Sequence, residues 1–500
     1  MILNQNYARF LVLHREIIRL EEVAALLSWD QATYMPKGAA ANRAEHLSVL
    51  SAHIHRIRIE STYAGLVNEV SVATDLTDEE QTQVRLAKRD LDKAVKLPTR
   101  LVEALARAAS LGKEAWLAAR KENQWSLFQE NLRELIALQK EVGTCLGFPK
   151  DPYTALLDEY EPGLTQAHLN GLFGPLRERL ATLVRKLTKR PLTVRQDIFN
   201  HEFPESAQLA LCTFMSAEMG LPEERTRLDK SAHPFCTSFS LNDVRRTVRF
   251  RQNNPFSGLF AVMHENGHAL YEMGFDLRLD GTPAGSAVSL GIHESQSRLW
   301  ENMIGRTLAF FETYHAILSD IFGSVMTGYS PAKLYALAAE VKPSLIRVEA
   351  DEVTYNLHIL LRYDLEQRLF NGSLTVEDLP EAWNNEMESL FGICPTKVTE
   401  GALQDIHWCL GSFGYFPTYT LGNLYAAQFR WAIERELGSF SDMIRDRRFS
   451  EIRGWLNRNV HCFGRLKSAD QVVKDATGEG LNPDYFFKYL EEKYTTLYGV

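Results

Sequence analysis

This chain of 500 residues lacks the cysteine spacing that is typical of a disulfide-stabilised fold or a thiolate metal site. Its six cysteines are scattered, and none forms a C-x-x-C pair. Reduced, buried thiols are the simplest interpretation. No run of about 18 apolar residues occurs, so we expect no membrane span. His14 and Arg15 interrupt the first apolar stretch, which is unlike a signal peptide. These absences predict a cytoplasmic protein. The cysteines are Cys145, Cys212, Cys236, Cys394, Cys409 and Cys462.

Blocks of one charge are absent as well. The chain has 55 Lys and Arg against 64 Asp and Glu, with the two signs interspersed and a net charge of −9. This distribution argues against nucleic acid as a partner. Internal repeats, low-complexity tracts and Pro/Ser-rich linkers are also missing. We therefore expect one large unit over residues 1–500, with two lobes around a cleft, rather than independent domains.

Strand signals are almost absent, whereas apolar residues recur at helical spacing along the chain. This spacing predicts a mostly α fold. The exception is residues 233–252, where alternation and Thr, Val and Phe predict two short strands. Residues 151–165 are rich in turn formers and predict a connector, which is either a structural loop or a substrate contact. Helices are expected over residues 7–29, 39–57, 78–95, 99–122, 125–146, 166–187, 204–219, 255–274, 297–322, 331–341, 344–369 and 373–390.

One stretch concentrates the chemistry. Residues 255–274 read PFSGLFAVMHENGHALYEMG, with His264, Glu265 and His268 in an H-E-x-x-H pattern. On a helix, positions i and i+4 share a face, so both imidazoles can meet one Zn²⁺. Glu265 then lies beside the metal and can deprotonate a water molecule. Gly267 allows another segment to approach closely.

A third ligand is available in the following helix. Glu294 lies 26 residues after His268, far enough for a loop and a return. Two His and one Glu leave a fourth position open, which is typical of catalytic zinc sites. The residues alone therefore predict a metallohydrolase.

Two arginines are candidates for contacting an anionic substrate. Arg347 and Asp351 lie at i and i+4 of an expected helix, where the carboxylate can hold the guanidinium in place. Arg245 shares one strand face with Asp243 and Thr247. That face either presents Arg245 to the cleft or is an exposed sheet edge whose charges prevent aggregation.

Residues 401–423, GALQDIHWCLGSFGYFPTYTLGN, form the second chemically dense stretch. Gln404, His407 and Trp408 are expected on one helix face, followed by a loop that carries Tyr415 and Tyr419. His407 is either a substrate contact or a core histidine. Tyr415, Tyr419 and His407 are candidates to stabilise a developing oxyanion, and Tyr419 is our hypothesis.

Six ordered motifs resemble the thermostable carboxypeptidases, the M32 metallocarboxypeptidase family. The stretches SWDQATYMP and DEYEPG in the N-terminal half are also similar to that family. The motifs are HPF (233–235), DVRRT (243–247), HENGH (264–268), HESQ (293–296), IRVEAD (346–351) and GALQDIHW (401–408).

The resemblance implies a large two-lobed helical fold around a deep groove, similar to neurolysin and angiotensin-converting enzymes, with a small β-sheet near the active site. Residues 1–230 would form a helical groove wall and residues 231–500 the catalytic part. It implies a homodimer that binds zinc, replaceable by cobalt, and releases single C-terminal residues other than proline from peptides. His264, His268 and Glu294 would bind the metal and Glu265 would be the general base. Arg347, Arg245, His233 and His407 would line the substrate end of the groove.

Two other functions remain open. An endo-oligopeptidase would use the same metal chemistry without an anchor for the substrate carboxylate. A non-catalytic peptide-binding protein would have no need of Glu265 beside the metal.

Overall fold

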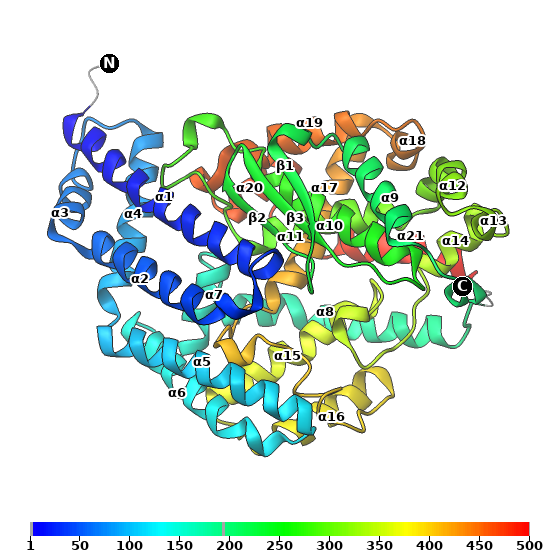
Figure 1. Cartoon of the computed structure of the whole chain (residues 1–500), viewed down its shortest axis with the longest axis horizontal. Helices are drawn as coiled ribbons and strands as arrows, with labels where there is room; N and C mark the ends of the chain where they lie inside the picture. Colours follow the sequence, from blue (N-terminus) through cyan, green and yellow to red (C-terminus); the bar gives the residue numbers. More distant parts are fainter. Residues whose placement is uncertain (1–3, 193–195, 500) are drawn as a thin grey trace.

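The computed structural model describes residues 4–192 and 196–499, and most of this part is helical (Figure 1). The first half contains α1 (Gln5–Thr33), α2 (Ala40–Ile59), α3 (Ser61–Val70), α4 (Asp78–Lys96), α5 (Thr99–Glu122), α6 (Gln129–Cys145), α7 (Pro152–Tyr160), α8 (Gln166–Thr188) and α9 (Glu205–Glu218). The second half contains α10 (Pro255–Glu272), α11 (Leu290–Arg298), α12 (Leu308–Phe322), α13 (Ser324–Thr327), α14 (Pro331–Ala338), α15 (Thr354–Asn371), α16 (Leu379–Phe391), α17 (Pro417–Leu437), α18 (Phe440–Arg445), α19 (Phe449–Asn459), α20 (Ala469–Thr477) and α21 (Asp484–Tyr498). The predicted fold class, mostly α with a small sheet, is confirmed.

Local capping explains where several helices begin. At α4 the Thr77 side chain accepts a hydrogen bond from the Glu80 N–H, and the Glu80 carboxylate accepts one from the Thr77 N–H. This capping box satisfies two backbone donors that would otherwise lack partners. α10 begins at Pro255, and Asn254 caps it through the Phe256 N–H. Proline suits a first helical position because its missing N–H would have no helical partner there.

The sheet has three strands rather than the two that the sequence predicts. Its order is β1–β3–β2, with β1 (Thr226–Lys230) parallel to β3 (Asp243–Val248), and β2 (Cys236–Ser240) antiparallel to it. β1 reads TRLDK, which has no apolar alternation, so its strand conformation depends on pairing with β3. Both β2 and β3 contact α10, which places the sheet beside the metal-motif helix.

Four expectations about local structure are wrong. The expected connector at 151–165 contains the helix α7. Asp151 caps the N-terminus of this helix by accepting a hydrogen bond from the Thr154 N–H. The expected helix over 344–369 starts only at Thr354, because residues 342–353 form an extended segment and one 3₁₀ turn. Residues 401–407 form turns and bends rather than an α-helix, and Trp408–Leu410 form a 3₁₀ turn. Tyr419 lies within α17, not in the loop. The expected helix over 297–322 is divided by a π-helix, Leu299–Gly305.

The apolar interior consists of two clusters. The larger one extends through the helices from α5 to α21 and includes the apolar face of α10. The smaller one lies within α1 to α4 and is built around Phe10, Ile17 and Val67. Figure 1 shows these four helices, in blue, grouped at one side of the molecule. No helix in the described part of the chain is long and apolar enough to cross a membrane.

All six cysteines are free thiols, as predicted. Their burial is not uniform, however. Cys212 and Cys409 are buried, whereas Cys394 is exposed and the other three are half-buried.

Candidate active site

α10 and α11 lie against each other closely enough to bring their polar side chains together. A Cβ atom at Gly267 would lie 2.5 Å from the Gln296 carbonyl oxygen and 2.7 Å from the Ser297 Cα. A Cβ atom at Gly422, on the neighbouring helix α17, would lie 2.5 Å from the Glu294 Cγ. Real Cβ atoms do not approach this closely, so both positions require glycine. The close approach expected at Gly267 is therefore made by α11.

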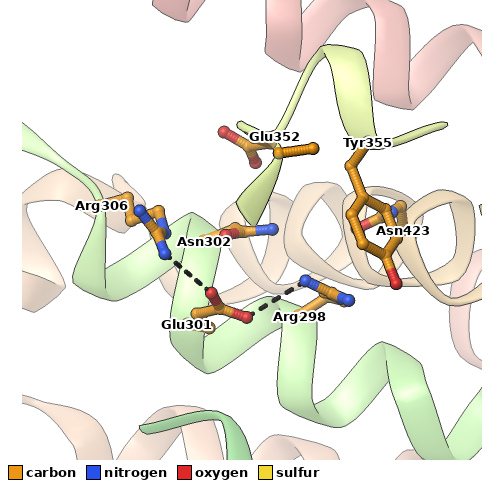
Figure 2. A pocket seen from close by; sticks show the side chains of 8 residues that line it. Arg298, Glu301, Asn302, Arg306, Glu352, Tyr355 and Asn423 are labelled. Atoms are coloured by element: carbon orange, nitrogen blue, oxygen red, sulfur yellow. Dashed lines mark hydrogen bonds and ion pairs between the residues drawn. The ribbon is translucent and has the colours of Figure 1, made fainter. Parts of the chain in front are cut away.

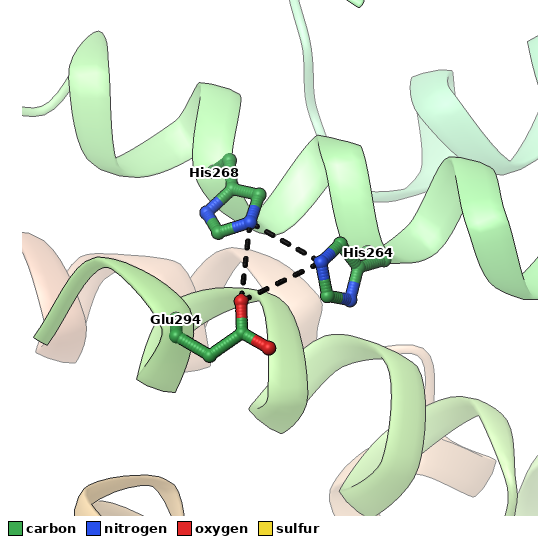
Figure 3. Close-up of side chains that lie close together, drawn as sticks. All are labelled: His264, His268 and Glu294. Atoms are coloured by element: carbon green, nitrogen blue, oxygen red, sulfur yellow. Dashed lines mark hydrogen bonds and ion pairs between the residues drawn. The ribbon is translucent and has the colours of Figure 1, made fainter. Parts of the chain in front are cut away.

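The three predicted metal ligands converge between these helices (Figure 3). His264 Nε2 lies 3.2 Å from His268 Nε2. Glu294 Oε2 lies 3.6 Å from His264 Nε2 and 3.5 Å from His268 Nε2. Ligands about 2.0–2.1 Å from a tetrahedral Zn²⁺ lie about 3.3–3.4 Å apart. The three atoms therefore have the mutual spacing of one face of a tetrahedral zinc site. Nitrogen and carboxylate oxygen are donors that zinc accepts.

The protonation of two of the three donors, His268 and Glu294, also suits a cation. Burial lowers the pKa of His264, but Glu294 and Glu301 outweigh burial and raise it above its usual value. Burial, together with the neighbouring His293, lowers the pKa of His268 to about 3, so its imidazole is neutral. Burial opposes ionisation of Glu294, but Arg298 and the two histidines hold the pKa of its carboxyl well below the usual range. Metal ligands must be deprotonated in this way.

Charged residues around the ligands hold them in place. Glu301 accepts a hydrogen bond from His264 Nδ1 at 2.9 Å. Arg298 binds Glu294 Oε1 at 2.6 Å and Glu301 Oε2 at 3.2 Å, and Arg306 binds Glu301 Oε1 at 3.0 Å. The arginines keep Glu301 anionic, so it can orient the imidazole of His264.

A small polar cavity of about 20 Å³ lies beside these charges, and this volume holds about one water molecule (Figure 2). Figure 2 shows Arg306 and Arg298 on either side of Glu301, with Tyr355 across the cavity. Its other lining residues are Asn302, Ala350, Glu352 and Asn423.

Glu265 is buried beside the ligands, with 5% of its surface exposed. Burial raises the pKa of its carboxyl to about 7, against the opposing influence of His264. A carboxyl with a pKa near neutrality can both accept and return a proton at neutral pH.

Arg347 is buried with its guanidinium next to a different carboxylate from the one we expected. Asp405 Oδ1 accepts hydrogen bonds from Arg347 Nε and Nη2 at 3.0 and 2.8 Å. The predicted partner, Asp351, instead caps α15 by accepting from the Val353 and Thr354 N–H groups. The prediction was wrong because this segment is not α-helical, so the two side chains do not share a helix face. Asp405 also binds Arg362 at 2.6 Å.

Arg347 is connected to the predicted metal ligands through aromatic residues. Its Nη1 donates to the Tyr355 hydroxyl at 3.0 Å, and the Arg298 guanidinium lies 4.6 Å from the centre of the Tyr355 ring. The Tyr419 ring lies 5.1 Å from the Arg347 guanidinium. Arg298 in turn binds Glu294, so a continuous set of contacts links Arg347 to the metal site.

Tyr415, Tyr419 and His407 form a cluster near the same place. The two tyrosine ring centres are 5.4 Å apart, and His407 Nε2 lies 3.3 Å from the Tyr419 hydroxyl. Burial raises the pKa of Tyr415 to about 12, with a further contribution from Glu294. Burial and Tyr415 raise the pKa of Tyr419 well above its usual value. Both hydroxyls therefore keep their protons and can donate hydrogen bonds. Burial lowers the pKa of His407 to about 4, so this histidine is neutral.

Two predicted substrate residues, Arg245 and His233, have surroundings that differ from those of this cluster. Arg245 forms a bidentate pair with Asp243 at 2.9 Å and stacks on Trp29, 4.3 Å from the ring centre. The stacking on Trp29 connects the sheet to α1. His233 is exposed.

Several residues around the site were not assigned a role from the sequence, among them Glu301, Arg298, Asp405, Tyr355, Glu272 and His293. One signal for Glu272 was present, because His264, His268 and Glu272 follow each other at i, i+4 and i+8. The contact between Asp405 and Arg347 joins residues 58 positions apart and left no local signal.

A helical fold with two histidines of one helix and a glutamate of the next around a cation-sized gap, beside a buried glutamate, defines a metallopeptidase class. Comparison with known proteins gives the family. Residues 9–494 match the model described as Carboxypeptidase Taq (M32) metallopeptidase. The chain belongs to this M32 carboxypeptidase family.

Relatives with assigned names agree. The chain is 39% identical over 508 positions to the thermostable carboxypeptidase 1 of Thermus thermophilus, covering 99% of each chain. It is 36% identical over 490 residues to carboxypeptidase 1 of Bacillus subtilis, covering 98% of each. The crystal structure of the M32 carboxypeptidase from Deinococcus radiodurans superimposes with a TM-score of 0.97 at 34% identity, covering 99% of this chain and 100% of that one. The chain is thus a carboxypeptidase, a peptide hydrolase.

Proposed function

We propose that this carboxypeptidase is zinc-dependent and removes single residues from peptide C-termini, with Glu265 as general base. The observation that carries the proposal is the gap between His264, His268 and Glu294, which fits a tetrahedral cation, next to the buried Glu265. Zn²⁺ bound there would polarise the scissile carbonyl and lower the pKa of a water molecule, and Co²⁺ has similar chemistry.

Glu265 moves the protons in this proposal. Its carboxylate accepts a proton from the attacking water, and its carboxylic acid then donates that proton to the leaving amine. The raised pKa supports both roles, because a carboxyl at its ordinary pKa would hold the proton too weakly. Burial of Glu265 also limits the access of bulk water during the transfer.

Arg347 is the proposed anchor for the substrate carboxylate. Two buried guanidinium groups, those of Arg347 and Arg362, share the single carboxylate of Asp405, which leaves one positive charge uncompensated. A free peptide C-terminus would neutralise that charge through a charge-assisted pair. An endopeptidase would have no use for it. Arg245 and His233 remain proposed contacts further along the substrate.

Tyr419 is the proposed donor to the oxyanion, with Tyr415 and His407 as its neighbours. A neutral hydroxyl donor placed where negative charge develops stabilises the transition state more than the ground state. The high pKa values of both tyrosines support this role.

The further properties that we propose follow from the family resemblance. They are broad side-chain tolerance with exclusion of proline, a homodimer and a cytoplasmic location. A peptide with a free C-terminus is the proposed partner, and neither nucleic acid nor a membrane is part of the proposal.

The test is mass spectrometry of one peptide in two forms, with a free and with an amidated C-terminus, after incubation with zinc-loaded protein. We expect stepwise loss of residues from the free form alone, abolished in Glu265→Gln. Cleavage inside both peptides would instead favour an endo-oligopeptidase and remove the proposed role of Arg347. No cleavage with zinc or cobalt would favour a non-catalytic peptide-binding protein.

A further inference from the structure

The two ligand histidines are supported in different ways. His264 Nδ1 meets a carboxylate directly, that of Glu301. His268 Nδ1 meets another imidazole, His293 Nδ1, and the ring centres lie 4.5 Å apart. His293 Nε2 lies 2.8 Å from Glu272 Oε1. A line of hydrogen bonds therefore runs from the metal position through His268 and His293 to Glu272.

Only one placement of the protons makes every contact along this line a hydrogen bond when His268 binds a metal. Nε2 of His268 faces His264 and Glu294, so it must carry the lone pair if it is to bind a metal. A neutral imidazole has one N–H, which then lies on Nδ1 and donates to His293 Nδ1. The proton of His293 must consequently be on Nε2, where it donates to the Glu272 carboxylate. With the opposite tautomer of His293, two N–H groups would face each other.

The surroundings hold His293 in this orientation. The ring of Tyr271, which is fully buried, contacts that of His293 edge-on with centres 5.3 Å apart. Glu272 lies on α10, one turn beyond His268, while His293 lies on α11 directly before Glu294. The helix pair that presents the ligands therefore also fixes the position of the two residues behind them.

We propose that His293, held by Glu272, is a positioning residue that fixes the tautomer and orientation of His268 as a metal ligand. This inference rests on the proposed metal site. Groups that orient a ligating histidine typically contribute about 10–100-fold in metal affinity. His293 thus acts through His268, and its effect is expected in metal binding even without substrate.

The experiment measures the affinity of the full chain for Zn²⁺ by competition with a chelator, and the visible d–d spectrum of the Co²⁺-loaded protein. His293→Leu removes the hydrogen-bond acceptor but keeps an apolar side chain of similar size. His293→Asn keeps an acceptor oxygen at the position of Nδ1, because both atoms are two bonds from Cβ. Glu272→Gln removes the charge that fixes the proton on Nε2.

We expect His293→Leu to weaken zinc binding by about 10–100-fold and to change the Co²⁺ spectrum. His293→Asn should recover most of the affinity, and Glu272→Gln should lie between the two. His315→Leu is the matched control, since His315 Nε2 donates a hydrogen bond to the Tyr329 carbonyl and the residue is half-buried on α12. It should leave metal affinity unchanged.

Wild-type affinity in His293→Leu would overturn the proposal, and so would equal losses in His293→Leu and His293→Asn, because the acceptor atom would then be irrelevant. If His293→Leu does not fold, the other two variants still decide. Glu272→Gln should bind zinc more weakly than His293→Asn. Wild-type zinc affinity in both variants would contradict the proposal. His268→Ala serves as the reference for loss of a ligand. Failure of the wild-type protein to bind either metal would instead refute the proposed metal site itself.

Discussion

Tyr419 contacts two other residues that we propose for the substrate site, His407 and Arg347. The Tyr419 hydroxyl lies 3.3 Å from His407 Nε2, and its ring lies against the Arg347 guanidinium. If Tyr419 donates to the oxyanion, Tyr419→Phe should lower kcat by about 10²-fold or more. Zinc content should stay unchanged, because Tyr419 is not a ligand. Steady-state kinetics with metal analysis checks this, and a near-normal kcat would transfer the role to Tyr415 or His407.

Asp405 and Asp351 should differ sharply in their effects on stability. Asp405→Asn leaves the buried guanidinium groups of Arg347 and Arg362 without a carboxylate, and breaking such a pair costs roughly 3–5 kcal/mol. Asp351→Ala removes the acceptor of the Lys342, Val353 and Thr354 N–H groups and of the Thr354 hydroxyl, but it leaves no buried charge without a partner, so we expect a smaller loss of roughly 1–3 kcal/mol. Urea unfolding compares the two, and KM should rise in Asp405→Asn alone. Equal losses of stability and equal KM values in the two variants would show that the charge of Asp405 is not needed to hold Arg347 in place.

The convergence of His264, His268 and Glu294 was predictable because these residues lie within two consecutive helices at a spacing that suits one metal ion. The contacts around Arg347 were not predictable, because they join residues that are far apart in the sequence. Gln404 accepts from the Arg347 N–H, and Arg347 binds Asp405, across 57 and 58 positions. These contacts hold both segments in non-helical conformations that override the local preference for helix.

At the scale of elements, helix boundaries followed local signals where caps were present. α5 spans Thr99–Glu122 as predicted, and α4 starts after its predicted cap Thr77. α7 was missed although Asp151 and Pro152 are a typical helix start. β1 was missed because a strand of charged residues has no pattern of its own and is defined by its partner β3.

The approach of α10 to α11 can be tested at Gly267. Gly267→Ala would place a methyl group against the backbone of Gln296 and Ser297, so the helices must separate. We expect a loss of roughly 1–3 kcal/mol in stability and weaker zinc binding, because Glu294 moves away from the histidines. Gly65→Ala is the matched control. It lies in α3 with no atom within 4 Å of the added Cβ, so it should be neutral or stabilise by up to about 1 kcal/mol. Thermal unfolding and zinc titration measure both, and equal behaviour would contradict the close-approach argument.

At the scale of the whole molecule, buried carboxyls predict how stability depends on pH. Burial raises the pKa of Glu161 to about 7, although hydrogen bonds from Ser289, Gly291 and Tyr425 oppose the shift. The folded protein thus retains a proton that the unfolded chain releases near pH 4.3. This contribution to stability is complete below about pH 4.3 and is lost as the pH rises to about 7.

Glu161→Gln removes that dependence while its amide oxygen can still accept from the Gly291 N–H, 3.0 Å away in the wild type. We expect the variant to unfold at a higher temperature than the wild type at pH 8, and the difference to shrink or reverse at pH 5. Scanning calorimetry at both pH values measures this. A loss of stability that is equal at the two pH values would mean that Glu161 is ionised in the folded protein.

The helices α1 to α4 have their own apolar cluster and are joined to the rest largely by charged and aromatic contacts. Arg89 pairs with Asp158 at 2.8 Å and Arg465 with Asp90 at 3.1 Å, and all four side chains are partly exposed. Trp29 of α1 stacks on Arg245. Partly exposed ion pairs are screened by salt, since the Debye length falls from about 10 Å at 0.1 M to about 3 Å at 1 M.

This construction predicts that α1 to α4 open locally more easily than the helices around the candidate metal site. Amide hydrogen exchange should be fastest in α2, where Ile54 is the single buried residue, and slow in α10 and α17. Raising the salt concentration from about 0.1 M to about 1 M should accelerate exchange in α1 to α4 and leave α10 unchanged. Trp29→Leu should accelerate it at both concentrations, because stacking on Arg245 depends less on screening than the ion pairs do. A uniform response of all helices to salt would show that the two apolar clusters unfold together.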